Sequence, residues 1–364
     1  SKVLLPRNCF MDRSRAFADM LLESAFLPHL TIFLIIALLF LLSTEISKEI
    51  FLSLTSDYGS SVWRVSVCEK ESMRFSSFSE ENQTAYGDSF SCDLIRYLDD
   101  WKISSKFSYT LRPIEEPDVV FVTYSSSNHF AEARQGIRSW KAAFKNKIIF
   151  YDLGLTKDEI AELDNVCDLE VRKFSFDRYP NFVSNLTGYH FKAIIMAEVF
   201  SEFNSYWIVD TSVRFFNLTT NLNKFYANVT KDVIEPFAMR KPAILSIYAA
   251  THPSMYKYLP IDEASSRELV QLAAGLTFIA RCELSREAVK WNVLCALTPE
   301  CMAPSGAQGL CIYGEDRYNT YANCHRFDQS SINIVMASLL KRDGWKSRDR
   351  LRTNSMENFT EVQR

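Results

Sequence analysis

The strongest constraint on this chain is an alternation of short apolar runs with helical segments that begins at Pro117. The first run, Asp118-Val-Val-Phe-Val-Thr-Tyr, is continuous, which is typical of a strand buried on both faces. A capping box of Thr156 and Glu159 starts a short helix. Strands are expected at 118–124, 147–151, 169–174, 206–209, 243–248 and 274–280, and helices at 130–144, 156–163, 189–203, 285–297 (capped by Ser285) and 329–340. This order predicts β-α-β units and an α/β fold with a mixed, mostly parallel sheet flanked by helices.

An apolar block from Ala25 to Leu42 precedes this region. Its length is close to the ~17–25 residues that a helix needs to cross a bilayer. More basic residues precede the block than follow it, which favours a cytosolic N-terminus. The alternatives are a cleaved signal peptide, although Ser43-Thr-Glu-Ile is a poor cleavage site, and a buried core helix. We expect a transmembrane signal anchor at residues 25–43, in contact with the lipid bilayer.

Two residue patterns indicate that the part after the block faces the lumen of the secretory pathway. Acceptor triplets for N-glycans all follow it, at Asn82, Asn185, Asn217, Asn228 and Asn358. Eight of the nine cysteines also follow it, and an even number suits an oxidising compartment. Four of these cysteines lie in the loop-like segment 295–324, where disulfides stabilise most. A zinc site is the alternative, but no Cys-x-x-Cys pair occurs.

These features predict a single-pass type II protein of the Golgi or ER membrane. The expected parts are a cytosolic tail at 1–24, the anchor at 25–43, a luminal stem at 44–115, the α/β domain at 116–341 and a basic tail at 342–364. The net charge of −3 gives no general attraction to nucleic acid. The sequence also lacks the glycine-rich phosphate loop, the dinucleotide fingerprint, the nucleophile elbow and the His-Glu-x-x-His zinc motif.

Polar residues follow several expected strands, where open α/β sheets bind ligands. The segment Thr123–Asn128 lies at the end of the first strand, Asp152 follows the second, and Asp210-Thr-Ser follows the strand at 206–209. Asp210 could hold a divalent metal or a ribose, or simply cap the turn after its strand. An Asp-x-Asp pair would supply two carboxylates, but Ser212 takes the second position.

A second group of candidates lies before the last helix, in His325-Arg-Phe-Asp-Gln. Asp328 and Gln329 could bind a sugar through paired hydrogen bonds, although Asp328 could also cap the helix. His325 could ligate a metal or remain structural. Lys192 and Arg214 are candidates to neutralise a diphosphate, and both residues could equally be ordinary surface charges.

An ordered set of motifs closely resembles an uncharacterised family that is expanded in nematodes and labelled domain of unknown function 1647. The resemblance covers roughly residues 115–340. The motifs are Phe121-Val-Thr-Tyr, Tyr151-Asp-Leu-Gly-Leu, Tyr189-His-Phe-Lys-Ala, Trp207-Ile-Val-Asp-Thr-Ser, Ala250-Thr-His-Pro-x-Met-Tyr, Leu294-Cys-Ala-Leu and Cys324-His-Arg-Phe-Asp-Gln-Ser.

A more distant resemblance links the strand-end Asp210, the run Ala274-Gly-Leu-x-Phe-Ile and the Asp328-Gln329 pair to GT-A glycosyltransferases of the family-8 type. It implies a GT-A-like fold, a UDP-sugar donor, Mn²⁺ as cofactor and a glycan or glycoprotein as acceptor. Ser212 departs from the Asp-x-Asp pattern of those enzymes. The hypotheses are therefore a glycosyltransferase and, alternatively, a non-catalytic glycosyltransferase-like fold that serves as a binding or surface protein.

Overall fold

The computed structural model describes residues 68, 70–78, 84–215, 222–340 and 360–362. The chain divides into two units, Ser1–Lys70 and Glu71–Arg364, and the fold below is that of the second unit. The expected anchor at 25–43 lies outside the described residues. Among the helices that are described, none has both the length and the apolar character needed to cross a membrane.

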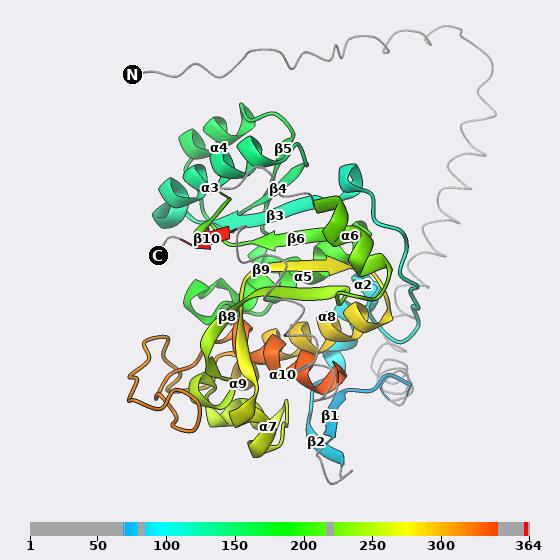
Figure 1. Ribbon diagram of the computed structural model, residues 1–364, viewed down its shortest axis with the longest axis vertical. Coiled ribbons are helices and arrows are strands. Elements are labelled where there is room, and N and C mark those ends of the chain that lie inside the picture. The colour runs from blue at the N-terminus through cyan, green and yellow to red at the C-terminus, as the bar shows by residue number, and fades with distance from the viewer. Residues whose placement is uncertain (1–67, 69, 79–83, 216–221, 341–359, 363–364) are drawn as a thin grey trace, which may run out of the picture. The chain divides into compact units, whose positions relative to one another are not determined.

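A six-stranded sheet with the order β5-β4-β3-β6-β9-β8 forms the centre of this unit (Figure 1). Its strands are β3 (Val120–Ser125), β4 (Ile148–Asp152), β5 (Leu169–Lys173), β6 (Ser205–Val209), β8 (Phe237–Ser246) and β9 (Val270–Ala280). Strands β5, β4, β3 and β6 run parallel, whereas β9 is antiparallel to both of its neighbours. The expected mixed, mostly parallel sheet is confirmed.

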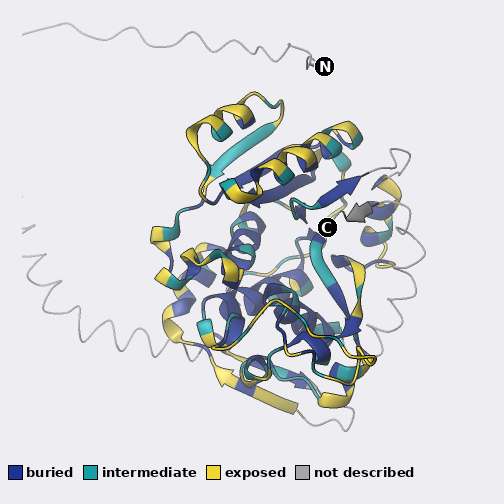
Figure 2. Ribbon diagram, turned by 90° about the vertical axis from the view of Figure 1, so that its left-hand side faces the viewer, coloured by how far each residue is buried: buried dark blue, intermediate teal, exposed yellow. Residues whose placement is uncertain are grey.

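Helices cover both faces of this sheet. The helices that follow β3 are α3 (Phe130–Ala143), α4 (Lys157–Asp164), α5 (His190–Glu202), α6 (Leu222–Thr230), α7 (Glu263–Glu268), α8 (Glu283–Ala296), α9 (Pro299–Met302) and α10 (Asp328–Leu340). Phe121, Trp207 and Phe278 pack in one core cluster with α3 and α6. On the other face, the Tyr206 hydroxyl donates to the Met196 carbonyl of α5. Burial on both faces explains the continuous apolar runs of the central strands (Figure 2).

The expected elements between residues 118 and 209 are each observed within two residues of their expected ends, and Thr156 and Glu159 form the expected capping box. The later strands differ, because β8 begins at Phe237 and β9 at Val270, several residues before the expected starts. The prediction that Ser285 is the N-cap of α8 was wrong. Cys282 is the N-cap, and its N–H donates to the Ser285 hydroxyl at 2.9 Å.

The predicted stem needs correction from Glu71 onward, because that part folds with the sheet. It contains β1 (Arg74–Phe78), β2 (Thr84–Ser89) and α2 (Ile95–Asp100). Phe75 packs edge-on against Trp291 of α8, with 5.4 Å between ring centroids. Glu71 forms a buried ion pair with Lys290, in which Nζ and Oε1 are 2.5 Å apart. Aromatic packing and a buried ion pair therefore anchor the segment that begins at Glu71 to helix α8.

Disulfides join Cys295 to Cys301 and Cys311 to Cys324. They lie in the glycine- and proline-containing segment for which the sequence predicts them, and oxidised sulfurs cannot serve as zinc thiolates. Cys68, Cys92 and Cys167 are also disulfide-bonded. Cys282 is free and buried. Within the predicted basic tail, β10 (Thr360–Val362) pairs antiparallel with β7 (Val213–Phe215).

Candidate functional site

The order of the strands defines one edge of the sheet as the place for a ligand. The chain proceeds from β3 through β4 to β5 on one side, and then returns to β6 on the other side of β3. The carboxyl ends of β3 and β6 therefore form a topological switch point, where open α/β sheets bind ligands. Tyr124 lies near the end of β3, and Asp210 directly follows β6.

Four side chains meet at this switch point, and we call Tyr124, Lys192, Asp210 and Asp328 the Lys192 cluster. Lys192 Nζ donates to both carboxylate oxygens of Asp210, at 3.0 and 3.2 Å. The same nitrogen lies 3.6 Å from Oδ2 of Asp328. The Tyr124 hydroxyl donates to Oδ1 of Asp210. One ammonium group thus joins the two carboxylates that the sequence singled out.

Backbone geometry fixes the acid at the centre of this cluster. The Asp210 N–H donates to the carbonyl of Gly275 in β9, at 2.8 Å. A Cβ atom at Gly275 would lie only 3.0 Å from Oδ2 of Asp210, so glycine leaves room for the carboxylate. Lys192 extends from the first turn of α5, and its ammonium lies 5.5 and 5.1 Å from the ring centroids of Tyr124 and Tyr189. Aromatic faces at this range favour a cation.

Burial and charge determine the protonation states in the cluster. Burial by itself lowers the pKa of Lys192, but the nearby carboxylates of Asp210 and Asp328 outweigh it and hold that pKa well above its usual range. Burial raises the pKa of Asp328, and Lys192 opposes this change. Burial, reinforced by the charge of Asp210, raises the pKa of Tyr124. Lys192 therefore carries a positive charge at neutral pH, and Tyr124 keeps its proton as a donor.

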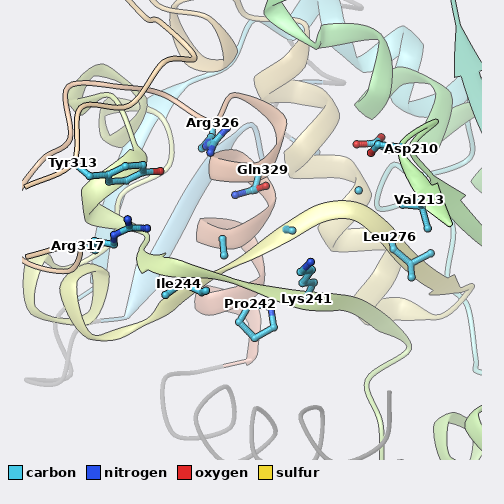
Figure 3. Close-up of a pocket in the computed structure, with 14 residues that line it drawn as sticks. Asp210, Val213, Lys241, Pro242, Ile244, Leu276, Tyr313, Arg317, Arg326 and Gln329 are labelled. Atoms are coloured by element: carbon cyan, nitrogen blue, oxygen red, sulfur yellow. The ribbon is translucent and has the colours of Figure 1, made fainter. Parts of the chain in front are cut away.

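A cleft of about 560 Å³ opens beside Asp210 (Figure 3). Asp210, Val213 and Leu276 lie at the right of this view, Tyr313 and Arg317 lie at the left, and Arg326 lies between them near Gln329. Lys241 and Pro242 of β8 and Gln329 of α10 also line the cleft. Its lining therefore combines one acid, three basic side chains, an aromatic ring and an amide.

Of the candidates from the sequence, the structure brings five together. Asp210, Ser212 and Gln329 line the cleft, and Lys192 and Asp328 lie beside Asp210. Gln329 is held against β9, because its Oε1 accepts from the Ala274 N–H at 3.4 Å and its Nε2 donates to Gln271 at 2.7 Å. Their roles in binding or catalysis remain predictions.

Three further candidates do not line the cleft. Oδ1 of Asp152 accepts from the N–H groups of Gly154 and Leu155, so this side chain caps the turn after β4. Thr123 is fully buried within β3. The Arg214 guanidinium is buried and donates to the carbonyls of Thr211, Val213 and Glu132. Asp152 and Arg214 therefore have structural roles. The prediction that Thr123, Asp152 and Arg214 contact a ligand is corrected, because none of the three lines the cleft.

The proposed metal role of His325 also needs correction. This residue is completely buried, and its Nδ1 accepts from the His252 N–H at 3.1 Å. Its Nε2 lies 3.0 Å from the carbonyl of Met302, to which it donates in the tautomer that Nδ1 requires. Both ring nitrogens therefore have partners within the fold, which leaves no lone pair for a metal.

Stability should depend on pH through His325. Burial lowers its pKa from 6.5 to about 4 in the folded chain, so the unfolded chain binds more protons between these values. Stability should consequently fall as the pH falls from 6.5 toward 4, by about 3 kcal/mol from this group. Denaturant unfolding at pH 7 and pH 4.5 should show a smaller difference for His325→Asn than for the wild type. The same change at exposed His129 is the control, and equal pH dependence in all three proteins would contradict the assignment.

The residues around Asp210 do not fit a divalent metal. Asp210 supplies one carboxylate, Ser212 replaces the second, and the Lys192 ammonium already contacts both oxygens of Asp210. Within the described ranges, no group of three or more histidine, cysteine or acidic side chains is arranged to hold a metal ion. The family-8 resemblance implies Mn²⁺ as cofactor, and the side chains around Asp210 do not support that expectation.

Sequence reasoning missed several residues that line the cleft. Lys241, Arg317 and Tyr313 lie in segments that carried no motif. Tyr124 belongs to the Lys192 cluster and not to the cleft lining, and it stood within the quoted motif that begins at Phe121. Arg326 stood within the quoted motif that begins at Cys324, but only its neighbours were considered. For Arg326 and Tyr124, the usable signal was the presence of a polar residue inside a motif that had already been quoted.

Comparison with protein-family models gave a match over part of the chain. The family model described as a protein of unknown function (DUF1647) matches residues 65–197. This match confirms the resemblance over 115–197 and extends it back into the predicted stem, in agreement with the packing of residues 71–115. A search of curated protein sequences gave no match.

Solved structures give low overall similarity. An active-site mutant of LgtC has 11% identity and a TM-score of 0.36, covering 60% of this chain and 70% of its own. The galactosyltransferase LgtC in complex with donor and acceptor sugar analogs has 11% identity and a TM-score of 0.32, covering 63% and 100%. Core-mannan synthase A from Aspergillus fumigatus, in a Mn/GDP form, has 9% identity and a TM-score of 0.36, covering 73% and 83%.

Proposed function

We propose that this chain is a glycosyltransferase with a GT-A-like fold that binds a nucleotide sugar in the switch-point cleft. The sugar would pass to a glycan or glycoprotein acceptor in the secretory pathway. The observation that carries the proposal is the position of Asp210 at the end of β6, beside a cleft lined by three basic side chains. A strand-end acid and clustered cations at a switch point suit a phosphorylated ligand.

The chemistry of the lining matches the parts of such a donor. The cleft volume of about 560 Å³ lies in the usual range for small-molecule sites. Arg317 and Arg326 carry forked guanidinium groups that suit phosphate oxygens. Tyr313 offers a ring surface, and Asp210 offers an acceptor for sugar hydroxyl groups. When the bond between sugar and diphosphate breaks, fixed cations stabilise the charge that develops on the departing diphosphate.

The proposed location is the Golgi or ER membrane, with residues 25–43 as a type II anchor and the folded unit in the lumen. The two disulfides of segment 295–324 support an oxidising compartment. Asn185 supports exposure to the glycosylation machinery, because it is solvent-exposed in a loop before α5. Neither feature depends on the cleft.

A second candidate is a non-catalytic binding protein with the same fold. The observation that favours it is the contact of Lys192 with both oxygens of Asp210, together with Ser212 at the second acidic position. A carboxylate engaged in this way is less available for catalysis. This candidate predicts binding of a nucleotide sugar without turnover.

The test is binding and turnover of UDP-sugars by the full chain, purified in detergent. We expect calorimetry to detect binding and product analysis to detect release of UDP. Asp210→Asn should reduce turnover at least tenfold, whereas Asp158→Asn, an exposed residue of α4, should not change it. Binding without turnover would favour the second candidate. Absence of both binding and turnover across a panel of UDP- and GDP-sugars would reject the proposal.

A further inference from the structure

We propose that the cleft binds the diphosphate of its ligand without a divalent metal. The Lys192 ammonium takes the place of the metal beside Asp210, and Arg317, Arg326 and Lys241 bind the phosphate oxygens. This inference rests on the proposed function, because it concerns the same cleft. It identifies the ligand's recognition element as a diphosphate held by fixed cations.

The Asp210 carboxylate already has hydrogen-bond partners on both oxygens. Both of its oxygens accept from Lys192, at 3.0 and 3.2 Å, and Oδ1 also accepts from Tyr124. A divalent metal ligated by Asp210 would have to lie within about 2.0–2.6 Å of an oxygen atom, next to the ammonium. Repulsion between the two cations opposes this arrangement, because both would lie in a partly dehydrated site.

Lys192 is held in place by its surroundings. Its side chain is 12% exposed, and Oδ2 of Asp328 lies 3.6 Å from Nζ, so the ammonium is paired with a second carboxylate besides Asp210. The rings of Tyr124 and Tyr189 lie near the same nitrogen. Movement of Lys192 to admit a metal would leave the buried Asp328 without its cation.

Arg326, which lines the cleft, carries a donor without a partner among the described residues. Nε of Arg326 is buried and has no hydrogen-bond partner within the described part of the chain. Buried donors are nearly always paired. Arg326 lines the cleft, so a small shift of its side chain toward a ligand oxygen would give this donor a partner. Arg317 lies over the Tyr313 ring, 4.5 Å from its centroid, which orients a second guanidinium at the cleft.

The three basic side chains that line the cleft are not neutralised by acidic neighbours in the described part of the chain. The structure gives no ion pair between a described carboxylate and Lys241, Arg317 or Arg326. Their charges are therefore available to a ligand. Three positive charges can neutralise the negative charge of a diphosphate, as a divalent metal does in other sites. Guanidinium groups can also bind phosphate through two parallel hydrogen bonds.

The experiment measures calorimetric binding of UDP and inorganic pyrophosphate to the full chain, once in EDTA and once in MnCl₂. We expect dissociation constants that agree within threefold between the two buffers. Arg326→Gln should weaken both ligands at least tenfold in EDTA, and Arg134→Gln, an exposed change in α3, should leave them unchanged. Because Arg326 is half-buried, thermal unfolding checks that its variant folds, and exposed Lys241→Gln provides a second cleft variant with an expected loss of at least threefold.

The outcomes separate this inference from the function on which it rests. Binding that occurs only with Mn²⁺ would overturn the metal-free site and leave the proposed function standing. Binding in EDTA that neither Arg326→Gln nor Lys241→Gln weakens would overturn the assignment of the cations. Absence of UDP and pyrophosphate binding in both buffers would reject the donor site itself, and the inference with it.

Discussion

Replacing Lys192 with methionine is expected to lower the free energy of unfolding by about 3–5 kcal/mol. Methionine keeps much of the side-chain volume but removes the cation between Asp210 and Asp328, whose side chains are 26% and 12% exposed. Two carboxylates would then face each other without a counter-ion. Denaturant unfolding of the wild type and the variant at pH 8 measures the loss.

The same variant should partly recover at lower pH. Burial and the charge of Asp210 already raise the pKa of Asp328, and without Lys192 this pKa rises further. A carboxyl group whose folded-state pKa lies above its unfolded value binds its proton preferentially in the folded state, so the deficit should shrink between pH 8 and pH 5. Lys147→Met is the matched control, because this lysine is exposed, its partner Glu170 is only partly buried, and such surface pairs contribute about 0–1 kcal/mol. Equal losses for the two lysines would contradict the cluster.

Replacing Gly87 with alanine is expected to destabilise the fold by about 3 kcal/mol. A Cβ atom at Gly87 in β2 would lie 2.0 Å from the carbonyl oxygen of Tyr258. The obstructing atom belongs to the backbone, so either β2 or the turn at Tyr258 must move. Such movement would also disturb the stacking of Phe90 on Tyr258, whose ring centroids are 5.4 Å apart.

The control for this substitution is Gly314→Ala. No atom lies within 4 Å of a Cβ built at Gly314, and its backbone is not in the left-handed region. We expect a change within about 0.5 kcal/mol. Thermal unfolding of both variants tests the docking of β2 directly. A Gly87→Ala protein as stable as the wild type would mean that residues 84–89 do not pack against Tyr258 in solution.

The central sheet was predictable because burial on both faces leaves a simple sequence signal. Runs such as 118–124 contain almost no polar residues, and their length matches strands between helices. The outer elements lack this signal. β1 and β2 contain serine, threonine and glycine and pair only with each other, so their composition resembles that of a loop. Their place in the fold depends on distant partners such as Trp291 and Tyr258, which no local pattern reveals.

The candidate site was predictable only where a residue adjoins the end of a central strand or a quoted motif. Asp210, Asp328 and Gln329 met that condition, and their proximity follows from the strand order. His325 and Arg214 met it as well, but sequence could not show that their polar atoms are taken up by carbonyl groups within the fold. Arg317 and Lys241 come from a long loop and an irregular strand. Only the folded arrangement brings such residues to one cleft.

The disulfide between Cys311 and Cys324 has a consequence for when the cleft becomes complete. The bond closes the loop that carries Tyr313 and Arg317, while Asp210 and Gln329 belong to elements outside it. With these two thiols reduced, the sheet and its acid would still form, but one wall of the cleft would be a free loop of the chain. Under the proposed function, formation of this one bond in an oxidising compartment would therefore complete the wall of the ligand site.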